Sequence, residues 1–102
     1  MKKYSGIWPV APTPFHPNGE VDYDGMKRVL NCMIDQGVDG ICILANFSEQ
    51  FLITDAEREA LSRLSLEHVA GRVPVIVTIS HYATNIVLQR ARVSKELGAA
   101  MV

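Results

Sequence analysis

The sequence of 102 residues has little that would direct it to a membrane, to nucleic acid or through a secretion pathway. No apolar run approaches the ~20 residues of a membrane-spanning helix, and no signal-peptide core follows the N-terminal lysines. The ten Lys and Arg residues are scattered and the net charge is −1, so no basic patch for nucleic acid is visible. The composition therefore favours a cytoplasmic protein that binds a small molecule.

Cysteine is also scarce, and its positions exclude the usual metal and redox motifs. Cys32 and Cys42 have neither CxxC spacing nor neighbours in a metal-ligand pattern. They fall in a predicted helix and a predicted strand, so we expect both to be buried thiols. The sequence predicts no metal ion and no cofactor.

Apolar residues are plentiful, and their runs predict buried strands. A hydrophobic share of 48% with 21% charged residues is typical of one globular domain, here residues 1–102. Ile41 to Ala45 is uninterrupted, as in a strand covered on both faces, and residues 72–80 repeat this pattern. Residues 6–11 can form only a short strand, because prolines interrupt the segment.

Three helices are predicted between these strands, from apolar residues spaced three and four apart. They cover residues 22–37, 54–70 and 84–98. The second begins with a capping box, in which the side chains of Thr54 and Glu57 bind each other's backbone amides. Strands and helices that alternate in this way form βα units with a parallel sheet.

The last residues resemble the opening of another strand. A helix, a glycine and an apolar run occur twice earlier in the chain, and residues 98–102 begin the same sequence of features. Because an eight-unit barrel needs about 250 residues, the expectation is an incomplete α/β domain. It would be the N-terminal two-fifths of a (β/α)8 TIM barrel, with three βα units and the start of a fourth strand.

Several motifs together resemble one enzyme family. They are residues 6–14, the Asn18-Gly19 turn, residues 40–49, the helix that begins at Thr54, and residues 71–76. Their order and spacing are similar to the N-terminal part of the dihydrodipicolinate synthase and N-acetylneuraminate lyase family, which are class I aldolases built as (β/α)8 barrels. The resemblance covers essentially the whole chain.

The resemblance implies a lyase that acts on a 2-keto acid through a lysine Schiff base. Members of the family use the imine as an electron sink for loss of a proton or cleavage of a bond at C3. Their Schiff-base lysine and proton-shuttling tyrosine would lie beyond Val102, so this chain would hold no catalytic residue and would be inactive alone. The resemblance also implies a homotetramer of the full-length protein.

The loop after the second strand departs from the family pattern, which usually reads Gly-Thr-Thr-Gly-Glu. The resemblance implies that Asn46, the Phe47 amide and Ser48 bind the substrate carboxylate, while Ala45 and Glu49 support the loop. Loss of the Thr pair removes a hydroxyl relay and argues against dihydrodipicolinate synthase chemistry. Together with residues 78–84, this variant is similar to the branch that dehydrates L-2-keto-3-deoxyarabonate towards 2-oxoglutarate semialdehyde.

Less specific interpretations stand beside this one. Asn46 and Ser48 can satisfy backbone groups of a loop, and Phe47 and Phe51 can be packing residues. A Glu49 alone in a loop is usually a solvated charge. Residues 80–82, Ser-His-Tyr, follow the next strand and could face the same pocket, but they are weak evidence for nucleophilic catalysis.

Two alternative functions remain open. One is a dihydrodipicolinate synthase or an aldolase-type 2-keto acid lyase of the same family. The other is a small α/β domain that binds a ligand without catalysis. Three parallel strands that are not closed into a barrel would expose unpaired edges, so an isolated fragment should be poorly soluble or molten.

Overall fold

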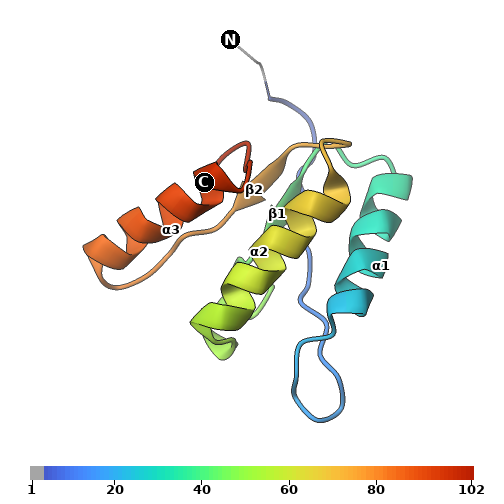
Figure 1. Ribbon diagram of the computed structural model, residues 1–102. Coiled ribbons are helices and arrows are strands. Elements are labelled where there is room, and N and C mark those ends of the chain that lie inside the picture. The colour runs from blue at the N-terminus through green and yellow to red at the C-terminus, as the bar shows by residue number, and fades with distance from the viewer. Residues whose placement is uncertain (1–3) are drawn as a thin grey trace.

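The structure is a computed structural model that describes residues 4–102, so the N-terminal lysines lie outside the described residues. Its helices and strands alternate in the predicted order, and Figure 1 shows the helices in chain order across the view with the strands behind α2. The elements are α1 (Tyr23–Asp35), β1 (Ile41–Ile43), the 3-10 turn η1 (Gln50–Leu52), α2 (Asp55–Val69), β2 (Val75–Val77) and α3 (Thr84–Glu96).

The two strands are parallel and have a further segment on each side. Val10 forms a parallel bridge with Cys42 of β1, and Met101 forms one with Ile76 of β2. The four segments therefore lie in the order of the chain, as consecutive strands of a barrel do. The predicted fourth strand begins at this bridge, where the Val77 amide donates to the Met101 carbonyl at 3.0 Å. Register pairs Ile41 with Val75, Cys42 with Ile76 and Ile43 with Val77.

The strands are shorter than predicted. The strand expected over Ile41 to Ala45 ends at Ile43, because Leu44 has a left-handed backbone with φ of 59°. The strand expected over residues 72–80 is confined to Val75–Val77. The segment of residues 6–11 is reduced to the bridge at Val10, consistent with the prolines around it.

The helix boundaries agree with the capping signals. Asp22 caps α1, and its carboxylate accepts from the Gly25 amide at 2.8 Å. The predicted capping box at the start of α2 is present: Thr54 Oγ1 accepts from the Glu57 amide at 3.1 Å, and Glu57 accepts from the Thr54 amide at 2.8 Å. The glycine that follows α1, Gly37, has φ of 84°, which glycine adopts without strain.

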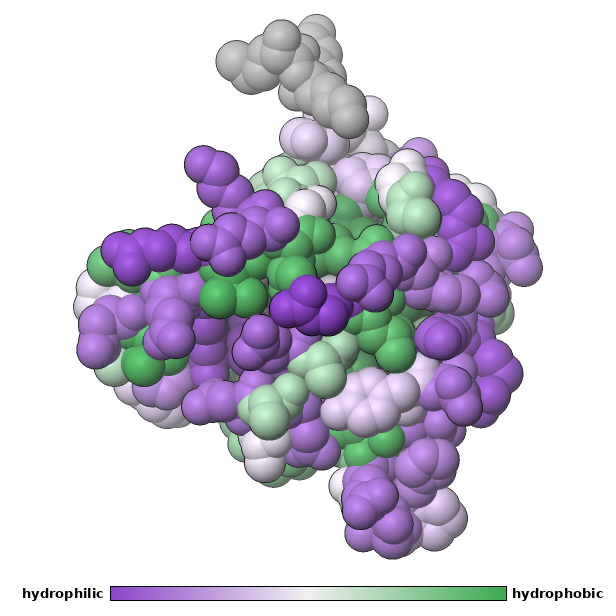
Figure 2. Space-filling view, viewed as in Figure 1, coloured by the Kyte–Doolittle hydropathy of each residue, from purple (hydrophilic) through white to green (hydrophobic). Residues whose placement is uncertain are grey.

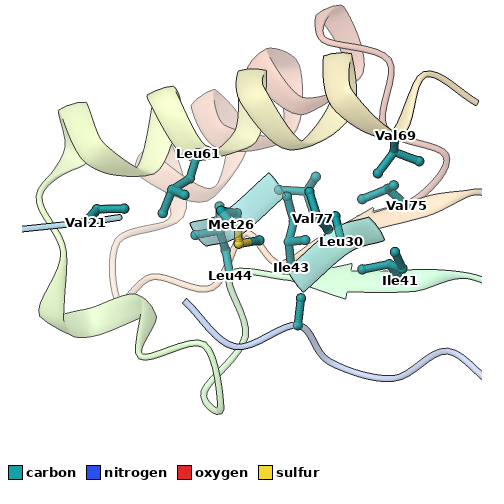
Figure 3. Close-up of a cluster of buried hydrophobic side chains, with 11 residues drawn as sticks. Val21, Met26, Leu30, Ile41, Ile43, Leu44, Leu61, Val69, Val75 and Val77 are labelled. Atoms are coloured by element: carbon teal, nitrogen blue, oxygen red, sulfur yellow. The ribbon is translucent and has the colours of Figure 1, made fainter. Parts of the chain in front are cut away.

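The core lies between one face of the sheet and helices α1 and α2 (Figure 3). Alternate strand residues such as Ile41 and Ile43 are buried there, while Cys42 between them is only half-buried. Burying each such side chain stabilises the fold by about 1.5–3 kcal/mol. Cys32 is exposed, so its predicted burial is wrong; it lies off the apolar stripe of α1. The core comprises Ala11, Val21, Met26, Leu30, Ile41, Ile43, Leu44, Leu61, Val69, Val75 and Val77.

The outer surface of the helices is mainly polar. Figure 2 shows hydrophilic side chains over the helices and hydrophobic ones in the seams between them. None of the helices within residues 4–102 is both long and apolar enough to cross a membrane. At the carboxyl ends of the strands, polar side chains meet backbone that departs from regular structure.

Candidate functional site

The loop after β1 is compact and turns sharply at two points. Leu44 and Glu49 both have φ near +60°, a conformation that residues other than glycine adopt at a cost and that clusters at functional sites. The Ser48 amide donates to the Ala45 carbonyl at 3.0 Å, and the Glu49 amide donates to the Asn46 carbonyl at 3.0 Å. The loop is thus held mainly by its own backbone.

Ser48 ties this loop to the preceding strand segment. Its side chain is buried, with 1% exposed, and its Oγ donates to the Ala11 carbonyl at 2.5 Å. A hydroxyl has one proton to donate, so in this geometry it is not available to a substrate carboxylate. The structure therefore makes Ser48 the anchor of the loop. Sequence reasoning missed the Ala11 carbonyl, since every residue has one and no side chain signals it.

Asn46 and Phe47 lie exposed at the turn of the loop. The Asn46 side-chain oxygen accepts from Gln50 Nε2 at 3.2 Å. Within residues 4–102, the backbone amides of Asn46 and Phe47 donate no hydrogen bond. Successive free amides are a common feature of anion-binding concavities in proteins.

The remaining loop residues divide between support and exposure. The Ala45 carbonyl accepts from Ser48 and, at 3.4 Å, from the Gln50 amide, so it supports the loop. The Glu49 carboxylate is exposed and forms no hydrogen bond with residues 4–102, and its supporting role stays a prediction. Phe47 and Phe51 are exposed by 68% and 57%, so neither ring is part of the hydrophobic core.

The segment after β2 lies next to this loop. The Thr78 amide donates to the Ile43 carbonyl at 3.1 Å, which brings the ends of the two strands together. Farther along, the rings of Tyr82 and Phe51 stack with their centroids 6.1 Å apart. His81 Nδ1 accepts from the Ala83 amide at 3.0 Å, so the proton of the neutral ring resides on Nε2.

Two arginines that sequence reasoning missed reach the same segment from the helices. Arg58 of α2 is buried and donates to the Thr78 carbonyl, and Arg90 of α3 donates to the Ser80 carbonyl at 2.7 Å. Burial, together with the charge of Arg90, lowers the pKa of Arg58 to about 10, while Asp55 acts in the opposite direction. Arg58 is therefore still charged at neutral pH. In the sequence, an arginine on a predicted helix resembles an ordinary solvent-exposed charge, so nothing there indicated these contacts.

The lysines of the described chain do not lie at the strand ends. Lys27 is on α1 and Lys95 is in the last turn of α3. A hollow of about 650 Å³ beside Lys27 lies on α1 and α2, away from the two loops. Within residues 4–102, no three His, Cys, Asp or Glu side chains come close enough to hold a metal ion.

Comparison with known proteins shows which family the chain belongs to. The family model described as "Dihydrodipicolinate synthetase family" matches residues 3–102. The chain belongs to the dihydrodipicolinate synthetase family. A member from Azospirillum brasilense named L-2-keto-3-deoxyarabonate dehydratase is 59% identical over 100 residues, which cover 98% of this chain and 32% of that protein.

Solved structures of the dihydrodipicolinate synthetase family share the fold. Dihydrodipicolinate synthase from Aquifex aeolicus superimposes with a TM-score of 0.90 at 29% identity over 94% of this chain and 32% of that one. YagE from Escherichia coli, solved in complex with pyruvate, gives 0.89 at 28% over 94% and 32%. The predicted class, the N-terminal βα units of a TIM barrel, is confirmed.

The chain spans about a third of the length of the relatives it matches. Within the family fold, the loops after β1 and β2 lie at the carboxyl ends of parallel strands. In TIM-barrel enzymes this face carries the active site. The two loops described above are therefore this chain's share of a candidate active site.

Proposed function

We propose that the complete protein carrying this chain is a lyase that dehydrates L-2-keto-3-deoxyarabonate. The observation that carries the proposal is the 59% identity, over 98% of the chain, to a protein named for that activity. The loop after β1 supports it, since Asn46 and Phe47 stand where the family usually has two threonines. A hydroxyl relay that begins at those threonines is absent here.

The proposed chemistry proceeds through an imine. A lysine elsewhere in the complete protein condenses with the C2 ketone and releases water. The protonated imine then takes the electron pair of the C3–H bond, which yields an enamine and a proton. Expulsion of the C4 hydroxyl as water, tautomerisation and hydrolysis of the imine give 2-oxoglutarate semialdehyde, with one water lost overall from the substrate.

The residues of this chain bind and orient the substrate in this proposal. The backbone amides of Asn46 and Phe47 donate to the C1 carboxylate, and Asn46 Nδ2 donates to it as well, while the side-chain oxygen of Asn46 accepts from Gln50. Ser48 holds the loop in place through Ala11. Fixing the carboxylate orients the ketone towards the lysine, and such positioning lowers the barrier without direct participation in bond making. The homotetramer remains a prediction of the resemblance, and the cytoplasmic location remains a prediction from the composition of the sequence.

A second candidate is a synthase or an aldolase that uses pyruvate. A family member from Escherichia coli is seen with pyruvate, and another is a dihydrodipicolinate synthase. An aldolase would split L-2-keto-3-deoxyarabonate into pyruvate and glycolaldehyde. A dehydratase would give the semialdehyde, which has the mass of the substrate less one water.

The experiment is product analysis with the complete protein. It is incubated with L-2-keto-3-deoxyarabonate and the products are identified by NMR and mass spectrometry. In parallel, borohydride is added with the substrate, and the protein mass reports any trapped imine. The proposal requires the semialdehyde and a covalent adduct on lysine. Pyruvate with glycolaldehyde would favour the aldolase, and no conversion with no adduct would contradict Schiff-base catalysis.

A further inference from the structure

The segment after β2, residues 78–83, lies beside the loop of the candidate site but outside regular secondary structure. The Thr78 amide binds the end of β1, and Tyr82 stacks on Phe51. The carbonyls of such a segment need donors other than a neighbouring strand. For two of these carbonyls, the donors are side chains of α2 and α3.

Arg58 and Arg90 are these donors. Arg58 is 7% exposed and donates to the Thr78 carbonyl. The side chain of Arg90 is 17% exposed, and it donates through Nη1 to the Ser80 carbonyl at 2.7 Å. One helix, α2, thus holds the Thr78 carbonyl, and α3 holds the Ser80 carbonyl, which immediately precedes His81.

Other partners do not account for the placement of these arginines. Arg90 Nη2 lies 3.3 Å from Asp55, but that carboxylate is 95% exposed, and exposed ion pairs contribute little. Arg58 Nη1 is buried and has no hydrogen-bond partner within residues 4–102, which costs free energy. The carbonyl contacts are therefore what these planar guanidinium groups specifically provide.

We propose that Arg58 and Arg90 are positioning residues that hold residues 80–82 as the second wall of the substrate site. They touch no substrate; they fix the Thr78 and Ser80 carbonyls and thereby the place of His81. With its Nδ1 bonded to the Ala83 amide, His81 presents its Nε2–H as a donor to a hydroxyl of the bound sugar acid. The inference rests on the proposed function for the identity of that ligand.

Hydrogen exchange in the complete protein, without substrate, tests the positioning itself. In Arg90→Gln, the amides of residues 78–83 should exchange about tenfold faster, since a hydrogen bond from a charged donor is lost. The Thr78 and Ala83 amides are the reporters. The matched control is Arg63→Gln, which removes an exposed arginine of α2 that pairs only with Glu59 within residues 4–102, and it should leave this segment unchanged.

Turnover of L-2-keto-3-deoxyarabonate tests whether the segment is a wall of the site. Arg90→Gln should raise KM about fivefold with kcat within about twofold, the pattern for loss of binding shared by ground and transition states. Arg90→Lys, which keeps a donor, should recover part of the loss. Arg58→Lys keeps the charge without the planar fork, and it should give a smaller increase in KM than Arg90→Gln does.

The outcomes separate the two proposals. Unchanged exchange in Arg90→Gln would overturn the positioning role whatever the substrate is. Faster exchange with an unchanged KM would show that the segment is held but does not border the substrate, which also overturns the inference. Wild-type protein that does not convert the sugar acid would contradict the proposed function, and the exchange comparison would still decide whether the arginines hold the segment.

Discussion

The two ends of the small parallel sheet are built differently. At the amino ends, Trp8 packs over Gly40 so closely that a Cβ there would collide with the indole. The Asp39 carboxylate accepts from the Ile7 amide at 2.8 Å and fills the space beside Gly6. At the carboxyl ends, by contrast, the loop after β1 presents the backbone amides of Asn46 and Phe47, which donate no hydrogen bond within residues 4–102. In TIM barrels the first kind of end serves stability and the second serves catalysis.

The largest effect is expected at the amino end, from Gly40→Ala. The added methyl group forces the Trp8 ring to move, and overpacking of this kind destabilises by about 2 kcal/mol. Urea unfolding of the complete protein, followed by circular dichroism, measures the change. The loss should shrink in a Trp8→Ala background, because the collision is then absent. A loss under about 0.5 kcal/mol would contradict the close packing.

Asn46→Ala tests the carboxyl end. It should raise KM for the 2-keto acid about tenfold, since a substrate hydrogen bond is lost, and leave the free energy of unfolding within about 0.5 kcal/mol. Asn85→Ala, which removes an exposed asparagine near the start of α3, is the control and should change neither quantity. Equal KM values for both variants would remove Asn46 from the site.

Ser48→Ala should change both stability and substrate binding, because this residue is buried and also anchors the site loop. Loss of its bond to the Ala11 carbonyl should destabilise by about 1 kcal/mol. KM should rise as the loop loosens. Ser5→Ala is a suitable control, since Ser5 is exposed, lies outside both loops, and within residues 4–102 only its backbone carbonyl is bonded. If the free energy of unfolding in urea were the same for both variants, the anchoring role of Ser48 would be contradicted.

The smallest effect is expected on the helices, at a residue of α2 that belongs to neither of the two loops after the strands. Burial, and then the charges of Arg72 and Lys27, lower the pKa of His68 below its usual value. The unfolded chain therefore binds a proton before the folded one does. Stability should be complete above the unfolded pKa of about 6.5 and decrease slightly as the pH falls below it. Urea unfolding at several pH values should show this decrease in wild type and not in His68→Gln.

Much of the fold follows from local signals in the sequence. The caps at Asp22 and Thr54 have defined side-chain chemistry, and glycine after a helix satisfies a backbone need, so these boundaries could be predicted. The strand end at Leu44 could not, because leucine gives no sign of a left-handed backbone. Exposure of Cys32 is set by which face of α1 packs on α2 and the sheet.

The candidate site was predictable in place but not in its connections. Polar residues at the end of a buried strand located the loop, and the family resemblance gave Asn46, Phe47 and Ser48 their expected roles. The bond from Ser48 to a backbone carbonyl depends on the tertiary fold. The same is true of Arg58 and Arg90, whose partners lie 20 and 10 residues away.

The most direct test of the central claim compares one variant from each end of the sheet. The concentration of pyruvate that gives half-maximal trapping by borohydride is measured for the complete wild-type protein, Asn46→Ala and Gly40→Ala, per folded molecule. The account predicts that this concentration rises about tenfold in Asn46→Ala and is unchanged in Gly40→Ala. An unchanged value in Asn46→Ala with a raised one in Gly40→Ala would contradict the assignment of function to the carboxyl ends.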